Sequence, residues 1–436
     1  MSVGLPYPPR TTAWSTVGIL LLFYMIAFLD RQILSLMAIP IQTDLQLDDV
    51  QIGLLNGFSF VLLYAFAGFF MGWLIDRYRR RIIVVAGVVI WSLSCVACGL
   101  AESFEALFIA RVGVGTAEAA LVPAVYSMLR DLFPPSRLSL ANGVFTVGGS
   151  LGIGLSFALG GLLIQFLASA PTTLPLLGTL RPWQVAFVLA GLPGIVLAWL
   201  MFAVPEPVRR GAPNPDKGLI APLLRFVASR PRAVLSHLVG TSLSALCAYS
   251  VFAWAPLFLG RRFELDTLSI GLMLGFAVGP CAMAGSLVAG GVADRFMRRG
   301  VTDIAFRMMA IALTFGACAC ALAFQMTSLP LFLLLVSING FVQGMNGAIT
   351  PAAMQLLGPA GLRGQLGACY LLFSSLIGAG LGPLLIGALT EHGFADRARV
   401  GDSVSLVVLG GGLTGAVLLW TARHAYRAAV VANDAG

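Results

Sequence analysis

Four ionisable side chains lie inside long apolar segments of this chain. Asp30 and Arg31 belong to an apolar stretch near residues 16–40, and Arg111 and Glu118 to a second one near 105–129. A charge at the centre of a membrane-spanning helix costs about 2.5 to 3.5 kcal/mol on insertion scales, so its presence indicates a use. Two carboxylates can take up and release protons, and two guanidinium groups can hold an anion.

The spacing of these four residues predicts that they form one site. Arg111 and Glu118 lie seven positions apart, close to two helical turns, and therefore share a helix face. Counting about 1.5 Å per residue from the span ends puts Asp30 at a depth between them. When all four groups are ionised the charges sum to zero, and one added proton upsets that balance.

We therefore predict that Asp30 and Glu118 are the proton-coupling residues. Arg31 and Arg111 would exchange between these carboxylates and an anionic group of a substrate. The alternative is an inert salt-bridge network that holds the first and fourth helices together.

The elements that must position these residues are membrane-spanning helices. Hydrophobic residues make up 58% of the 436 residues and charged residues only 11%, with a mean hydropathy of +0.91, which excludes an ordinary soluble protein. Twelve apolar stretches are long enough to cross a bilayer, so we predict an all-α membrane protein with twelve transmembrane helices. They lie near 16–40, 51–75, 82–101, 105–129, 138–167, 184–204, 234–258, 268–292, 304–324, 329–356, 364–390 and 402–422. The first lacks an A-x-A-like cleavage site, so we interpret it as a helix rather than a signal peptide.

The basic residues indicate how the helices are oriented. The net charge is +8, with an isoelectric point near 9.4, which could suggest a nucleic-acid partner. Most of the 27 Lys and Arg residues, however, lie in the termini and in the loops on the same side. The opposite loops hold Arg181, Arg261, Arg262, Arg397 and Arg399. By the positive-inside rule both termini face the cytoplasm, and we expect a multi-pass protein of a bacterial inner membrane with no nucleic-acid partner.

The chain also contains an internal duplication. The pattern from Gly72 to Arg81 (GWLIDRYRRR) recurs from Gly290 to Arg299 (GGVADRFMRR), and upstream of it Gly53 and Gly57 match Gly271 and Gly275. Two similar halves are typical of secondary transporters. We predict two pseudo-symmetric six-helix bundles, residues 1–204 and 234–436, joined by a cytoplasmic linker, 205–233, that is rich in proline and charge.

The duplicated pattern resembles the signature loop of the major facilitator superfamily. In that family the loop is a cytoplasmic gate, because an Asp beside several Arg can form salt bridges that exist in one arrangement of the halves and break in the other. The resemblance assigns this role to Gly72, Asp76, Arg77, Arg81, Asp131, Asp294 and Arg295. The alternative is a plain positive-inside anchor, which explains neither the Asp nor the repeat.

A finer resemblance is to the Spinster-like branch of that superfamily. It is carried by Leu29-Asp-Arg-Gln-Ile-Leu34 and by Arg111-Val-Gly-Val-Gly-Thr-Ala-Glu-Ala119. Ala117 stands where a glycine is usual, and Trp73 replaces a basic residue of the gate motif. The resemblance implies a proton-coupled secondary transporter that works by alternating access and moves an amphipathic lipid, such as a lysophospholipid or a sphingoid phosphate. The alternative is a carrier of a small organic anion or a drug efflux pump.

The second half has neutral residues where the first half has charges. Asn339 and Asn346 align with Arg111 and Glu118, and together with Gln343 they form one polar stripe. This stripe indicates either substrate contact or hydrogen bonding between helices. Further candidate cavity-lining residues are Tyr249 and Trp254.

Other kinds of function have little support in the sequence. An intramembrane enzyme would need a nucleophile with a base, a metal cluster or paired carboxylates open to water, and the Asp30 and Glu118 pair with its two arginines suits ion coupling better. No His or Cys cluster has metal-ligand spacing, and Cys95-Val-Ala-Cys98 lies in a spanning helix where small apolar residues suit packing. We expect no cofactor besides the coupling proton, a monomer, and a small amphipathic or anionic substrate.

Overall fold

The computed structural model describes residues 7–168, 173–174, 178–209, 221–359 and 362–434. The first half contains α1 (Arg10–Leu36), α2 (Ala38–Leu45), α3 (Asp49–Gly53), the π-helical turn η1 (Leu54–Phe58), α4 (Ser59–Arg77), α5 (Arg80–Gly99), α6 (Phe104–Glu118), α7 (Leu121–Leu132), α8 (Pro135–Ala168), α9 (Pro182–Leu197) and the 3-10 helix η2 (Ala198–Ala203). Between α8 and α9, β1 (Thr173–Leu174) and β2 (Gly178–Thr179) form a short antiparallel hairpin, with Thr173 opposite Thr179. This hairpin is the one departure from the predicted all-α fold among the described residues.

The second half consists, in its described residues, of helices joined by short turns and loops. It contains α10 (Ala221–Ser229), α11 (Pro231–Phe263), α12 (Thr267–Met297), α13 (Ile304–Ala323), α14 (Leu329–Leu357), α15 (Arg363–Phe373), the π-helix η3 (Ser374–Leu381), α16 (Gly382–Ala388), the π-helical turn η4 (Leu389–Phe394), the 3-10 turn η5 (Arg397–Arg399) and α17 (Val400–Asp434).

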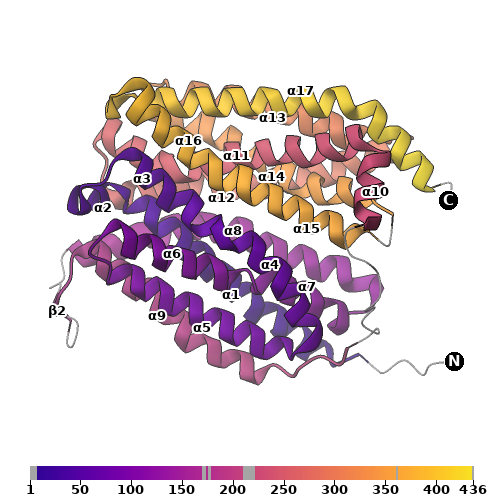
Figure 1. The fold of residues 1–436 in the computed structure, drawn as a ribbon, viewed down its shortest axis with the longest axis horizontal. Coiled ribbons are helices and arrows are strands. Elements are labelled where there is room, and N and C mark those ends of the chain that lie inside the picture. The colour runs from indigo at the N-terminus through magenta and orange to yellow at the C-terminus, as the bar shows by residue number, and fades with distance from the viewer. Residues whose placement is uncertain (1–6, 169–172, 175–177, 210–220, 360–361, 435–436) are drawn as a thin grey trace.

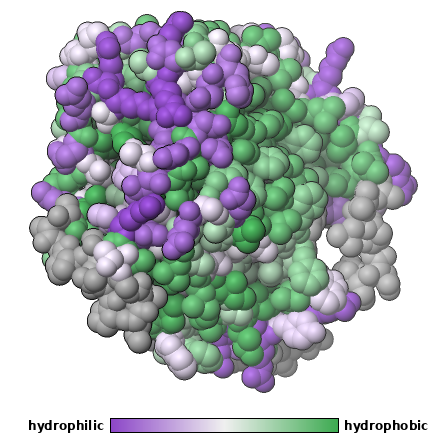
Figure 2. Space-filling view, turned by 60° about the vertical axis from the view of Figure 1, so that its left-hand side comes forward, coloured by the Kyte–Doolittle hydropathy of each residue, from purple (hydrophilic) through white to green (hydrophobic). Residues whose placement is uncertain are grey.

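The helices are long and apolar enough to cross a membrane. Eleven described segments meet both criteria, and a shorter apolar stretch, Leu151–Leu167 in α8, accounts for the twelfth predicted span. Large apolar side chains such as Phe276 (73% exposed) and Trp199 (72% exposed) point away from the core, where lipid would cover them. Figure 2 shows a broad hydrophobic surface, with hydrophilic residues gathered where the helix ends come forward. The predicted all-helical, multi-pass membrane fold is confirmed.

Two prolines interrupt spanning helices close to the charged residues. Helix α1 ends at Leu36, four positions before Pro40, and α6 ends at Glu118, shortly before Pro123. A proline cannot donate to the carbonyl four residues earlier, and its ring clashes with that carbonyl. Glu118 therefore occupies the last turn of α6, next to a break in the fourth span.

The two halves of the chain form two layers of roughly parallel helices (Figure 1). Helices α1 to α9 make one layer and α11 to α17 the other, and both termini lie at the same end. We call this the inner end and the opposite one the outer end. Helix α10 lies across the inner end of the second layer, nearly perpendicular to its neighbours.

Glycines matched by the duplication bring the two layers into contact. A Cβ on Gly57 would lie 2.4 Å from the carbonyl oxygen of Ala379, and a Cβ on Gly275 would lie 2.6 Å from that of Gly154. Both distances are shorter than a real Cβ contact allows, so only glycine fits there. The repeated glycines thus form two close seams between the bundles, on opposite sides of the centre.

Candidate functional site

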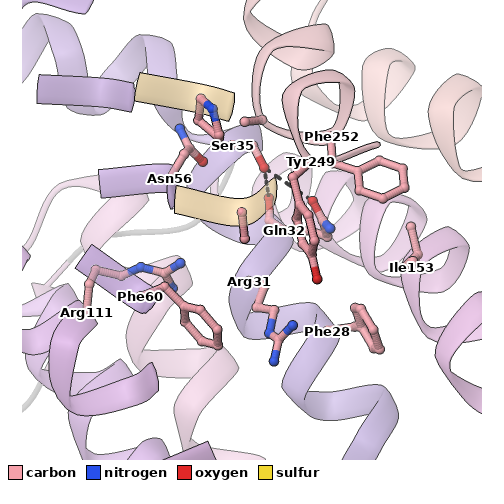
Figure 3. A pocket seen from close by; sticks show the side chains of 13 residues that line it. Phe28, Arg31, Gln32, Ser35, Asn56, Phe60, Arg111, Ile153, Tyr249 and Phe252 are labelled. Carbon is pink, nitrogen blue, oxygen red and sulfur yellow. Dashed lines mark hydrogen bonds between the residues drawn. The ribbon is translucent and has the colours of Figure 1, made fainter. Parts of the chain in front are cut away.

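A cavity of about 130 Å³ lies between the two layers. Its lining includes Arg31, Gln32 and Ser35 of α1, Asn56 of η1, Arg111 of α6 and Tyr249 of α11. Figure 3 shows these side chains converging from both bundles. The cavity therefore contains two of the four charged residues that the sequence singled out.

Arg31 and Glu118 form a two-point ion pair at this cavity. The Arg31 Nε donates to Glu118 Oε2 at 3.2 Å, and Arg31 Nη2 donates to Glu118 Oε1. The Glu118 side chain is buried, whereas the Arg31 side chain retains 15% exposure. Paired donors and acceptors make such guanidinium–carboxylate contacts strong and directional. Arg31 is thus held in place by Glu118 while one edge of it stays open to the cavity.

Aromatic rings surround the Arg31 guanidinium. Its central carbon lies 4.3 Å from the centre of the Phe60 ring, 5.4 Å from Phe28 and 5.7 Å from Tyr64. Ring faces attract a cation and exclude water, which strengthens electrostatic contacts made there. An anion that reached Arg31 would meet this water-poor surface.

Asp30 and Arg111 lie close to this ion pair, and the central guanidinium carbon of Arg111 is 5.8 Å from the centre of the same Phe60 ring. Arg111 Nη1 donates to the main-chain carbonyl of Asp30 at 3.2 Å, and both side chains are almost completely buried. Neither carboxylate oxygen of Asp30 accepts a hydrogen bond from a nitrogen or hydroxyl donor of the described residues, and the Cys95 thiol lies next to this carboxylate. Arg31, Arg111 and Glu118 all lie within electrostatic range of that carboxylate. The structure brings the predicted quartet together, with one direct ion pair, between Arg31 and Glu118, and with Asp30 in no salt bridge among the described residues.

Only one of the candidate residues from the second half lines the cavity. Tyr249 does so, whereas Trp254 is fully buried and its indole Nε1 donates to the carbonyl of Pro383 at 3.1 Å. Trp254 therefore connects α11 to α16 rather than facing a substrate.

The polar stripe of α14 makes contacts between helices. Asn346 Nδ2 donates to Ser244 Oγ at 2.9 Å, and Ser244 Oγ donates to Gln343 Oε1 at 3.2 Å. Asn339 is buried as well, and none of these amides belongs to the cavity lining. Of the two readings of this stripe, the geometry favours hydrogen bonding between α11 and α14.

The duplicated motif forms an ion-pair cluster within the first bundle. Arg80, which the sequence reasoning did not select, is fully buried; its Nη1 donates to Asp131 and its Nε donates to Glu206 Oε1 at 3.1 Å. Glu206 also accepts the main-chain N–H groups of Arg80 and Arg81, at 3.1 and 2.9 Å, and thereby caps the start of α5. The Pro-Glu-Pro sequence around Glu206 was the available signal for this cap.

The other predicted gate residues lie at the inner surface. Arg77 is exposed and stacks over Trp73 at 4.4 Å, and Asp294 and Arg295 are exposed at the end of α12. The side chain of Asp76 lies outside the described residues. Among the described residues, a Cβ on Gly72 would meet nothing within 4 Å.

At the outer end an ion pair joins the two bundles. Arg261 of α11 donates to both carboxylate oxygens of Asp49, at 2.7 and 2.9 Å, and to Gln42 Oε1 at 2.8 Å. Arg397 donates to the carbonyl of Leu47 at 3.2 Å. The Asp49 carboxylate is completely buried. Sequence reasoning missed this contact because its partners come from distant segments and have no shared motif.

No group of three or more His, Cys, Asp or Glu residues that could hold a metal ion occurs in the described ranges. Cys95 is buried, and its thiol donates to the carbonyl of Phe187 at 3.5 Å, in a helix-packing position.

Two helical bundles around a buried charged cavity define a secondary transporter architecture.

The comparisons with known proteins identify the family. The family model of the Major Facilitator Superfamily matches residues 20–383, and the chain belongs to that superfamily. The chain is 29% identical to an MFS-type efflux pump of Mycolicibacterium smegmatis, covering 96% of this chain and 94% of the relative. It is 26% identical to the probable L-galactonate transporter of Escherichia coli, covering 90% and 89%. Among solved structures, a bacterial homologue of the lysosomal transporter Spinster, inward-facing and occupied, aligns with a TM-score of 0.77 at 24% identity, covering 97% of each chain.

Proposed function

We propose that this protein is a proton-coupled carrier of a compact organic anion, working by alternating access in a bacterial inner membrane. The observation that carries the proposal is the Arg31 guanidinium, which is fixed by Glu118 and flanked by aromatic rings at the wall of a central cavity. A substrate carboxylate could accept from the same N–H groups that Glu118 now occupies.

Charge balance supports proton coupling. The four ionised groups sum to zero, so one bound anion would add a negative charge to a buried site. One proton on Glu118 or Asp30 removes that charge. Anion and proton therefore favour each other's binding, which is the thermodynamic basis of symport.

The size of the cavity supports a compact substrate. Its volume of about 130 Å³ is below the roughly 300 to 1,000 Å³ of pockets that enclose drug-sized ligands. One relative in E. coli is named as a probable L-galactonate transporter, and L-galactonate is a sugar acid, an anion of compact size. A sugar acid is the substrate class that we propose first.

An amphipathic lipid anion is the second candidate. Phe28, Phe252 and Ile153 give the cavity an apolar wall that an acyl chain could contact. Both candidates place the anionic group at Arg31 and differ in what occupies the rest of the site. Selective thermal stabilisation of purified protein by sugar acids would support the first, and stabilisation by lysolipids alone would support the second.

Alternating access also requires that the two ends close in turn. The bundles are joined at the outer end by Asp49 and Arg261, so this arrangement is closed on that side. We propose that the inner motif closes in the other state, with the uncovered Gly72 as a place of close approach.

Uptake into proteoliposomes under an imposed pH gradient tests the proposal. Glu118→Gln should abolish the stimulation of anion uptake by the gradient, and Arg31→Gln should abolish substrate binding. Glu105→Gln, which changes an exposed carboxylate of the same helix, is the matched control. Gradient-driven uptake that survives in Glu118→Gln would refute the proposed coupling.

A further inference from the structure

The cavity is also lined by neutral polar side chains that are not part of the charged quartet. Gln32, Ser35 and Asn56 form a neutral polar patch that faces the cavity from α1 and η1 (Figure 3). Only 6% of Gln32 and 2% of Ser35 is exposed, so water reaches them poorly. Buried amides in a membrane protein need hydrogen-bond partners, because an unpaired polar group there costs free energy.

The hydrogen bonds of this patch leave specific atoms for a ligand. Ser35 Oγ donates to the Gln32 carbonyl at 3.1 Å and lies 3.3 Å from Gln32 Oε1, and Asn56 Nδ2 donates to the carbonyl of Ile52 at 3.2 Å. Within the described part of the chain, Gln32 Nε2 and Asn56 Oδ1 have no such partner. The patch therefore offers a donor group, the Gln32 NH2, and an acceptor atom, Asn56 Oδ1, which matches the dual character of a hydroxyl group.

The backbone around Asn56 explains how this patch is presented. Asn56 lies in the π-helical turn η1, where the helix is locally wider than an α-helix. The same turn holds Gly57 against Ala379 of η3, so the neighbouring Asn56 is placed at the cavity. Such π-helical turns often occur at functional sites.

We propose that Gln32 and Asn56, supported by Ser35, are specificity-determining residues that bind hydroxyl groups of the transported anion. Arg31 binds the carboxylate of the substrate, and the amides form hydrogen bonds with the hydroxyl groups on the carbon chain beside it. The inference rests on the proposed anion transport and adds to it that the carrier selects hydroxylated carboxylates over alkyl carboxylates of the same length. A site built to hydrogen-bond a hydroxyl discriminates strongly against an analogue that lacks it.

The test compares gluconate with hexanoate, two six-carbon carboxylates that differ in their hydroxyl groups. Both are assayed as competitors and as labelled substrates in proteoliposomes under a pH gradient. Wild-type protein should prefer gluconate by about a hundredfold or more. Gln32→Leu and Asn56→Leu, which remove the amide while keeping a similar volume, should each lower gluconate uptake about tenfold and leave hexanoate uptake within about twofold.

Two controls separate a binding effect from a folding effect. Gln325→Leu removes an amide at the outer surface, away from the cavity, and should change neither substrate. Thermal unfolding of each variant shows whether the fold is kept, and Gln32→Asn, which keeps an amide, should restore part of the gluconate preference.

The outcomes distinguish this inference from the proposed function. Equal wild-type uptake of gluconate and hexanoate, or equal losses of both in Gln32→Leu and Asn56→Leu, would overturn the hydroxyl-reading role while leaving anion transport intact. Carboxylate uptake that is insensitive to Arg31→Gln would instead contradict the proposed anion site, and the inference would fall with it.

Discussion

Arg261 and Asp49 form a buried two-point ion pair that connects the outer ends of the two bundles. Both carboxylate oxygens of Asp49 accept from Arg261, at 2.7 and 2.9 Å, and the carboxylate has no exposed surface. Removal of one member of a buried pair leaves an uncompensated charge, which costs about 3 to 5 kcal/mol. In the proposed alternating-access cycle this contact would break when the outer end opens, so its strength would contribute to the balance between the two states.

Breaking this pair should therefore open the outer end. We expect Arg261→Gln to increase labelling of a cysteine introduced at Ala253, in the cavity wall, by a membrane-impermeant maleimide added from outside. Arg262→Gln, which changes an exposed neighbour, should leave labelling unchanged. The double variant with Asp49→Asn should show much less than the summed effect, because both changes remove the same contact. Additive effects would argue against the pair as a closing contact.

Neutralising Asp30 should abolish the coupling of uptake to the pH gradient without lowering the thermal stability of the protein. Its carboxylate is buried and accepts no hydrogen bond from a nitrogen or hydroxyl donor of the described residues, so Asp30→Asn removes a buried charge at nearly constant volume. We expect thermal stability to stay equal or to rise, while uptake loses its dependence on the pH gradient. Asp266→Asn, at an exposed helix cap where Asn serves equally well, is the control. Marked destabilisation with intact coupling would indicate that the charged quartet is only a structural network.

Arg80 should matter more to stability than the other arginines of the duplicated motif. It pairs with Asp131 and Glu206 in a buried cluster, whereas Arg77 is exposed. Arg80→Ala should lower the unfolding free energy by about 3 to 5 kcal/mol, and Arg77→Ala by less than about 1 kcal/mol. Thermal denaturation in detergent measures the difference. Equal losses from both variants would contradict a stabilising role for the buried Arg80 cluster.

Substitution of a glycine at a seam between the bundles should hinder closure of the outer end, without changing any charged residue. A Cβ at Gly57 would lie 2.4 Å from a carbonyl oxygen of η3, whereas one at Gly68, in the same span, would meet nothing within 4 Å. Gly57→Ala should therefore hinder closure of the outer end and reduce uptake at least about tenfold. Gly68→Ala should keep transport and unfold at the same or a slightly higher temperature, because alanine favours helix. Normal uptake by Gly57→Ala would mean that the close contact at Gly57 is not needed for transport.

Much of the architecture follows from local features of the chain. Apolar runs longer than the bilayer is thick predict spanning helices whatever their neighbours are. Pro40 and Pro123 break helices through their own covalent geometry, and the repeated glycines mark places of close approach. The charged quartet was predicted for a related reason, because Asp30 and Glu118 are costly in lipid wherever their helices pack.

Which side chains contact one another could not be predicted from such local features. Arg31, rather than Arg111, pairs with Glu118, and Trp254 turns toward a backbone carbonyl instead of the cavity. Such outcomes depend on helix rotations and depths of a few ångström, which the hydropathy of a segment does not encode.

The sequence by itself thus determined that the chain spans a membrane in two related halves and contains four charges that need one another. Only the tertiary structure decided that Asp49 meets Arg261, that Arg80 is the buried arginine of its motif, and that Gln32 and Asn56 share a cavity wall. The physical reason is that transfer into lipid is a property of each segment, whereas a pairwise contact exists only after two helices have packed.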